Sequence, residues 1–210
     1  MTRRRSTGAE SREAIVDSTV EVLELEGACG LSVSAVMRRA GASRTTFYRH
    51  FDDVYGVVAE ILQRVGAELL TSAGDWLNDP QALGRPEVVY PNLLGYARSF
   101  DAHGRLLAAL SDASVIDEGI RRLWDGLIEE FVEITADAIR RDQAVGTVRA
   151  DLDAEAVALV LTLMGERVSV QMLGRERKCD PEAYAAMLTP IWIGTLFGVV
   201  PQDDRAAPRE

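Results

Sequence analysis

Arginine and hydroxylated side chains gather in one acid-free segment of a chain that is acidic as a whole. Residues 27–51 contain no Asp or Glu, although the 210-residue chain has a formal net charge of −10. The segment carries Arg38, Arg39, Arg44 and Arg49 beside several Ser and Thr residues. Guanidinium groups and hydroxyls bind phosphate oxygens and the edges of bases, so this composition predicts a surface for a polyanion such as nucleic acid.

The charge is divided unevenly along the chain. Residues 1–50 hold eight Arg and six acidic residues, whereas residues 51–210 hold fifteen basic and twenty-seven acidic residues. A chance bias on a solvated face would give a similar count. The turn chemistry of the same segment favours instead an N-terminus that binds nucleic acid on an acidic body.

The acid-free segment has the pattern of two short helices joined by a tight turn. Ser32 and Ser43 each stand at the N-cap position of a helical stretch. Gly41 gives the backbone freedom that the turn between them requires. At about 100° per residue, Phe47 and Phe51 share one face of the second helix, which we expect to be buried.

The opposite face of the second helix presents hydroxyls, a guanidinium and a phenol that suit the major groove of DNA. Free backbone N–H groups at the start of the first helix favour phosphate binding, and an Arg-rich arm over residues 1–9 would reach the minor groove. Ordinary packing of Tyr48 and simple solvation of Arg38 and Arg39 are alternative interpretations. The residues predicted to contact DNA are Ser32, Ser34, Thr45, Thr46, Tyr48, Arg49 and His50.

Helical periodicity dominates the remainder of the chain, and no stretch alternates as a strand does. A first helix over residues 11–26 is expected to bury Ile15, Thr19, Val22 and Leu23 and to end at the following Gly. Further helices are predicted at 54–77, 87–101, 104–112, 115–143, 152–175 and 181–198, with Asp53, Asp151 and Asp180 at helix starts. The predicted fold class is therefore all-α.

The expected domain organisation follows from these elements. A three-helix DNA-binding domain with a helix-turn-helix is expected over residues 1–52, with its basic arm at 1–9. A helical bundle is expected over residues 53–200, followed by a flexible tail at 201–210.

Several classes of function are disfavoured by residue content. Cys29 and Cys179 are too few for a disulfide framework, and no Cys/His spacing suits zinc. His50 and His103 are the only histidines, and no catalytic constellation is recognisable, so we expect neither an enzyme nor a bound metal or cofactor. The apolar runs are too short to span a bilayer and no signal peptide is recognisable, so a cytoplasmic protein is expected.

The run LSVSAVMRRAGASRTTFYRHF over residues 31–51 resembles the DNA-binding signature of the TetR family of bacterial one-component repressors. That family usually has a Lys shortly after the last Phe, where this chain has Val54, which places more of the phosphate binding on Arg residues and the N-terminal arm. By this resemblance, the base-facing residues are Arg44, Thr45 and Thr46, and the phosphate-facing residues are Ser32, Tyr48 and His50.

Two later runs, LTLMGER at 161–167 and IWIGTLFG at 191–198, resemble helices of the EthR-like subset of that family. In that subset an apolar channel lined by aromatic residues admits hydrophobic ligands, although such residues taken alone would indicate ordinary core packing. Thr162 and Gly165 stand where the subset has polar Asn contacts, which implies a different or less polar ligand. The residues implied to line the channel are Tyr96, Phe100, Trp124, Ile128, Phe131, Thr162 and Trp192. Glu166, in an apolar helix, is interpreted as half of a buried pair with an Arg.

The last two long predicted helices are apolar on more than one face, which predicts burial against a second copy of the chain. TetR-family proteins also dimerise through these helices. The working hypothesis is a homodimeric repressor that binds a palindromic operator and is released by a small hydrophobic molecule. A carrier or sensor that has lost DNA binding and an enzyme built on a helical bundle are the alternatives.

Overall fold

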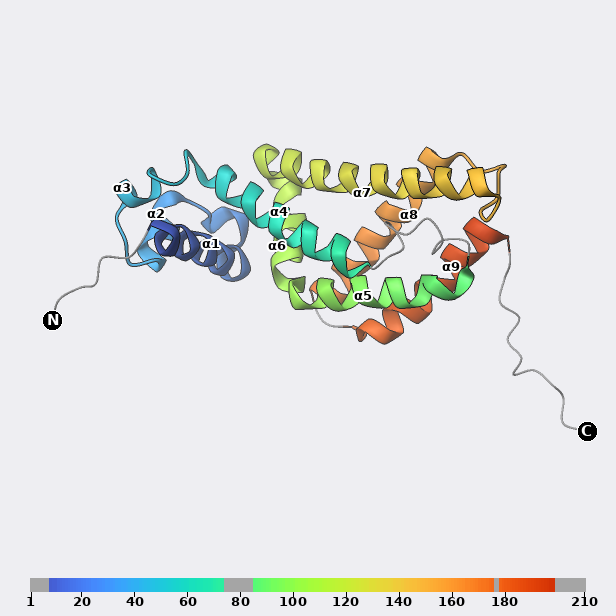
Figure 1. The fold of residues 1–210 in the computed structure, drawn as a ribbon. Helices are drawn as coiled ribbons and strands as arrows, with labels where there is room; N and C mark the ends of the chain where they lie inside the picture. The colour runs from blue at the N-terminus through green and yellow to red at the C-terminus, as the bar shows by residue number, and fades with distance from the viewer. Residues whose placement is uncertain (1–7, 74–84, 176–177, 199–210) are drawn as a thin grey trace, which may run out of the picture. The chain divides into compact units, whose positions relative to one another are not determined.

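Each element in the described part of the chain is helical, as the periodicity of the sequence predicted, so the all-α fold class is confirmed (Figure 1). The structure is a computed structural model that describes residues 8–73, 85–175 and 178–198. Its α-helices are α1 (Gly8–Gly30), α2 (Val33–Arg39), α3 (Arg44–Phe47), α4 (Val54–Ser72), α5 (Val89–Ala102), α6 (Gly104–Ile116), α7 (Glu118–Val145), α8 (Ala154–Ser169) and α9 (Pro181–Phe197). A 3-10 helix, η2 (Pro86–Val88), precedes α5, and a π-helical turn, η3 (Val170–Gly174), follows α8.

Side-chain caps and glycines set several helix ends where the sequence predicted them. Helical geometry in α1 breaks at Gly27, whose φ of 65° lies in the left-handed region. The Asp53 carboxylate accepts a hydrogen bond from the Gly56 amide at 3.0 Å at the start of α4. The Asp180 carboxylate likewise accepts from the Ala183 amide at 2.7 Å, and caps α9.

Two predicted boundaries are wrong. The cap of α8 is Asp153, which accepts from the Ala156 amide at 3.1 Å, whereas Asp151 forms an ion pair with Arg149 at 2.7 Å. The interruption between α6 and α7 falls at Asp117 rather than at residues 113–114, because Asp117 adopts an extended backbone there.

Some predicted segments lie outside the described residues: the end of the long helix at 74–77, most of the following loop, residues 1–7 of the basic arm and the tail at 201–210. The last two residues of the expected arm, Gly8 and Ala9, belong to α1.

The chain divides into two compact units, residues 1–68 with 103–129 and residues 69–102 with 130–210. This division does not coincide with the domain boundary predicted at residue 52, because α6 packs against α1 and so joins the N-terminal helices. The boundary predicted at residue 52 separates a DNA-binding domain from a ligand-binding domain. Packing alone does not test this division of function, so it stays a prediction.

The first unit has one apolar core beneath α2 and α3. The side chains of α1 predicted to be buried, Ile15, Thr19, Val22 and Leu23, are all buried. The Thr19 hydroxyl donates to the Ile15 carbonyl at 2.8 Å, so this polar group is satisfied inside the core.

The second unit is organised around the packing of α5 against α9, and α8 also contacts α9. A Cβ atom at Gly95 would lie 2.0 Å from the Ser72 carbonyl oxygen, so only glycine permits this approach of α5 to the end of α4. Tyr184 and Leu188 of α9 are completely buried in the unit.

With the π-helical turn included, Ala154–Gly174 forms a 21-residue helical stretch of mean hydropathy 1.4. It is longer than the apolar run read from the sequence, and by length and composition alone it could cross a membrane. A single such helix is weak support for a membrane span, since a helix in the core of a soluble protein has the same composition.

Asp142, near the end of α7, is a buried acid with unusual surroundings. It has no exposed surface, and its carboxylate oxygens lack hydrogen-bond partners among the described residues. Burial raises the pKa of this carboxyl group, and the Arg141 guanidinium, with Nε 3.6 Å from Oδ1, opposes the shift only in part. The folded chain therefore holds the proton more tightly than the unfolded chain. The resulting stabilisation is present at acidic pH and is lost as the pH rises through the raised pKa.

We expect Asp142→Asn to raise the free energy of unfolding at pH 7 by about 1–3 kcal/mol, because the amide removes a poorly compensated buried charge. The gain should be smaller at pH 4 than at pH 7, because the raised pKa leaves the wild-type carboxyl group partly protonated at the lower pH. Urea unfolding at the two pH values measures both effects. Asp137→Asn, on the exposed side of α7, is the control and should change stability by less than about 0.5 kcal/mol. A destabilised Asp142→Asn protein at pH 7 would mean that the pair with Arg141 is favourable.

Candidate DNA-binding surface and apolar cavity

The helix-turn-helix predicted from the sequence is formed by α2, a glycine turn and α3. The Ser32 hydroxyl accepts from the Ala35 amide at 3.2 Å and caps α2, and the Ser43 hydroxyl accepts from the Thr46 amide at 3.2 Å and caps α3. Both predicted caps are confirmed.

Gly41 allows the sharp turn between the two helices. Its φ of 61° lies in the left-handed region, and a Cβ atom there would meet nothing within 4 Å. The need for glycine is therefore conformational rather than steric. The turn closes with a hydrogen bond from the Ala42 amide to the Met37 carbonyl at 3.1 Å.

The anchoring face of α3 is buried as predicted. Phe47 has no exposed surface and Phe51 only 7%. Their ring centroids lie 5.9 Å apart, and Tyr48 meets the edge of Phe47 at 5.6 Å while remaining 54% exposed. The Tyr48 ring thus packs and is also accessible to a partner.

The other predicted DNA-contacting side chains lie on the surface of the first unit. Thr46 and His50 are half-buried, and the Thr46 hydroxyl lies 3.0 Å from the Ser43 hydroxyl. The exposed residues of the predicted set are Ser32, Ser34, Arg44, Thr45, Tyr48 and Arg49. Arg39 forms an ion pair with Glu21 of α1 at 3.3 Å, so this guanidinium supports α2 as well as adding charge.

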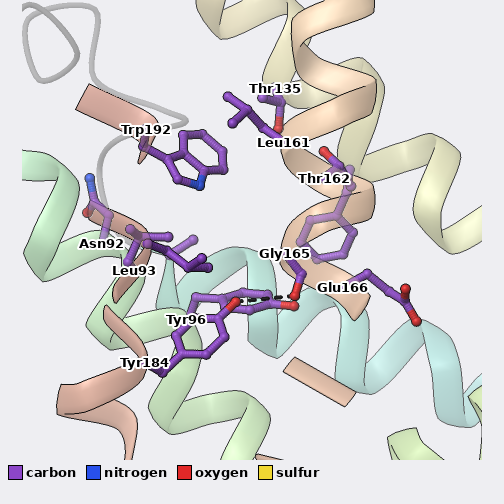
Figure 2. A pocket seen from close by; sticks show the side chains of 13 residues that line it. Asn92, Leu93, Tyr96, Thr135, Leu161, Thr162, Gly165, Glu166, Tyr184 and Trp192 are labelled. Carbon is purple, nitrogen blue, oxygen red and sulfur yellow. Dashed lines mark hydrogen bonds between the residues drawn. The ribbon is translucent and has the colours of Figure 1, made fainter. Parts of the chain in front are cut away.

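An apolar cavity lies within the second unit, between α5, α7, α8 and α9, with a free volume of about 70 Å³ (Figure 2). The lining residues are Ala73, Asn92, Leu93, Tyr96, Phe131, Thr135, Leu161, Thr162, Gly165, Glu166, Tyr184, Leu188 and Trp192. The cavity is therefore built by one compact unit.

Four of the seven predicted channel residues line this cavity: Tyr96, Phe131, Thr162 and Trp192. Phe100 does not, because it is buried behind Tyr96 with ring centroids 6.0 Å apart. Trp124 and Ile128 belong to the other compact unit and do not line the cavity either. Helical spacing of aromatic residues shows that they share one face of a helix, but it does not show whether that face lines a cavity.

A cluster of hydroxyl groups forms one wall of the cavity. The Ser169 and Tyr184 hydroxyls lie 2.8 Å apart, and both reach the Gly165 carbonyl. The Ser169 hydroxyl also lies 3.5 Å from that of Tyr96. Burial raises the pKa of Tyr96 to about 12, and it also raises that of Tyr184. Both phenols are consequently neutral hydrogen-bonding groups at physiological pH.

Two polar side chains give the cavity further chemical character. The Asn92 Nδ2 atom is buried and has no hydrogen-bond partner among the described residues. Glu166, which the sequence suggested as half of a buried pair, lines the cavity, and its negative charge contributes to the raised pKa of Tyr96.

Sequence reasoning did not select Tyr184 and Leu188 for the cavity, although a signal for them exists. They precede Trp192 at intervals of four residues, which places all three on one face of α9. Asn92 similarly precedes Tyr96 by four residues on α5. Thr135 likewise follows Phe131 by four residues on α7. Among the described residues, no group of three His, Cys, Asp or Glu side chains is placed to hold a metal ion.

Comparison with known proteins agrees with these observations. Residues 15–61 match the family of bacterial regulatory proteins called tetR, and residues 92–198, more than half of the chain, match the C-terminal domain of the transcriptional regulator EthR. The HTH-type transcriptional regulator EthR of Mycolicibacterium smegmatis is 26% identical over 203 residues, which cover 94% of this chain and 91% of that protein.

Solved structures share the fold. A TetR-family regulator from Rhodococcus sp. superposes with a TM-score of 0.70 at 23% identity, covering 88% of this chain and 97% of that one. The SmeT–triclosan complex superposes with a TM-score of 0.71 at 18% identity, covering 95% and 99%.

The capped helix-turn-helix and the helical second unit define a DNA-binding transcriptional regulator, and not an enzyme. The chain belongs to the TetR family of bacterial regulators and is of the EthR-like type.

Proposed function

We propose that this regulator is a homodimeric, cytoplasmic repressor that binds a palindromic operator and is released by a small, mainly apolar molecule. One observation carries the proposal: the same chain combines an exposed face on the helix-turn-helix with an apolar cavity in its second unit. The DNA contacts we propose are the eight residues predicted from the sequence, with Arg44, Thr45, Thr46 and Arg49 reading bases.

Arg49→Ala should lower operator affinity about 5- to 150-fold, because a guanidinium that pairs with a base edge contributes about 1–3 kcal/mol. Tyr48→Ala should weaken binding through loss of a phosphate contact. Electrophoretic mobility shifts, with an operator selected from random sequence, measure both changes. Arg98→Ala, which removes an equally exposed arginine from the second unit, is the control and should bind normally. Normal binding by Arg49→Ala would remove this residue from the reading face.

Exposed apolar side chains on α8 and α9 support the proposed dimer. Leu159, Val160 and Leu163 form a stripe on α8 at intervals of three and four residues, and each is at least 45% exposed. Met187 and Ile191, four residues apart, are likewise exposed on α9. Their opposite faces are already buried in the second unit, so a second copy of the chain is the proposed cover.

Val160→Asp should shift the protein to monomer at micromolar concentration, because dimerisation would bury the new carboxylate in an apolar interface. Operator affinity should fall as the dimer dissociates, since a palindromic operator is bound by the two helix-turn-helix elements of one dimer. Sedimentation velocity gives the oligomeric state. Val115→Asp on α6 is the matched control, because that valine is also exposed but belongs to the first unit. An unchanged dimer for Val160→Asp would contradict the proposed interface.

The cavity lining favours an uncharged ligand with a hydrogen-bond acceptor. Glu166 is the only charged residue among the described residues that line the cavity. A ligand carboxylate would therefore be desolvated beside a like charge. A carbonyl or ether oxygen can instead accept from the Asn92 amide, whose buried Nδ2 atom has no partner among the described residues.

The size of the cavity suggests how a ligand acts on DNA binding. The free volume of about 70 Å³ is small beside the several hundred Å³ that drug-sized ligands occupy. A larger ligand would have to stabilise a form of the second unit in which the helices have separated. Such a ligand releases DNA if that form binds the operator less well, with a typical coupling of about 1–3 kcal/mol.

Octanamide and octanoate form a matched pair of probes for this ligand chemistry. We expect octanamide to bind the wild-type protein at least tenfold more tightly by calorimetry, and Glu166→Gln to improve octanoate alone. Trp192→Ala should weaken both probes by removing an apolar wall. Equal binding of the two probes to the wild-type protein would refute the predicted selectivity, whereas a wild-type protein that selects no operator in the absence of any probe would refute the proposed function.

A further inference from the structure

A guanidinium from α1 reaches the end of the DNA-reading element. The Arg12 Nη1 atom donates to the carbonyl oxygen of His50 at 3.0 Å, and His50 is the last of the residues predicted to contact DNA. The Arg12 Cζ atom also lies 4.3 Å from the centroid of the Phe51 ring, within the range of a cation–π contact. Both contacts are within the first compact unit.

The same guanidinium is anchored on α4. Its Nη2 atom donates to the Glu60 carboxylate, and its Nε atom lies 3.4 Å from the other oxygen of that group. The Glu60 side chain is only 15% exposed, so this pair is better shielded from water than an ordinary surface ion pair. The planar guanidinium of Arg12 thus binds both α4 and the end of the turn that follows α3, called here the α3 turn.

This anchoring matters because α3 is short. It has four residues in α-helical geometry and then a turn through His50, whose amide donates to the Phe47 carbonyl at 2.9 Å. So short a helix has little stability of its own. Carbonyl groups at a helix end also lack internal partners, and a cation at this end is favoured by the helix dipole.

We propose that Arg12 is a positioning residue of the DNA-binding surface: it fixes the orientation of the α3 turn by joining the His50 carbonyl and the Phe51 ring to Glu60. It acts through α3 and does not itself contact DNA. Its removal leaves the reading side chains present but held less firmly, so discrimination between operator and other DNA falls more than general affinity does.

Arg64 provides a matched control. It also donates to the Glu60 carboxylate and binds Glu13 of α1 at 2.8 Å, and its side chain is 42% exposed against 43% for Arg12. Among the described residues, its hydrogen bonds and ion pairs go to Glu13 and Glu60 and not to the α3 turn. Arg12→Gln and Arg64→Gln therefore each remove one positive charge and the pairing with Glu60. Arg64→Gln also removes the pair with Glu13, but only Arg12→Gln releases the end of α3.

The experiment compares the two variants with the wild-type protein on a selected operator and on unrelated duplex DNA. We expect Arg12→Gln to lower operator affinity about tenfold, with binding to unrelated DNA and the salt dependence unchanged. Arg64→Gln should match the wild type in both. Arg12→Lys keeps the charge but not the fork, and should lose about threefold. Hydrogen exchange of the amides of residues 48–51 should accelerate in Arg12→Gln only.

Two results would overturn the proposal. Equal operator affinity and equal exchange in the Arg12→Gln and Arg64→Gln proteins would show that the contact with the α3 turn does not matter. A parallel loss on both DNAs, with a salt slope reduced by about one, would show that Arg12 binds a phosphate directly. If the wild-type protein selects no operator, the proposed function fails, and hydrogen exchange still decides whether Arg12 holds the turn.

Discussion

A reading helix of four residues cannot hold its own shape, and the organisation of the first unit follows from this constraint. Ser43 stabilises its start, Gly41 sets its angle to α2, and the buried Phe47 fixes its inner face. Hydrophobic burial supplies most of the stabilisation but is not directional. The directional contacts are the hydrogen bonds of the caps and of Arg12, which determine where the outer face points.

The second unit meets a different requirement, because it keeps a cavity inside a helical core. The aromatic and aliphatic walls give it an apolar interior, while the Ser169 and Tyr184 hydroxyls satisfy each other and the Gly165 carbonyl. A buried amide without a hydrogen-bond partner costs free energy. In Asn92 this cost is consistent with a group that serves a ligand rather than the fold.

The distribution of charge fits both units. The excess of acids after residue 50 keeps the body soluble and repels DNA from it, while the acid-free segment attracts DNA. Neutralisation within the first unit is selective: Arg12, Arg39 and Arg64 have acidic partners, whereas Arg44 and Arg49 are exposed on the reading face. The orientation of an approaching DNA is therefore set by a small part of the surface.

The sequence by itself determined the all-α class, the family and the helix-turn-helix, because caps, glycine turns and apolar periodicity are local properties that one short segment expresses. Ser32, Gly41, Ser43 and Phe47 were all assigned correctly for this reason. Tertiary structure alone decided which aromatic residues enclose the cavity. Phe100 and Phe131 have similar sequence signals, yet only Phe131 lines it, since helix rotation depends on neighbours far away in the chain. Arg12 reaches His50 across thirty-eight positions, and no local pattern encodes such a contact.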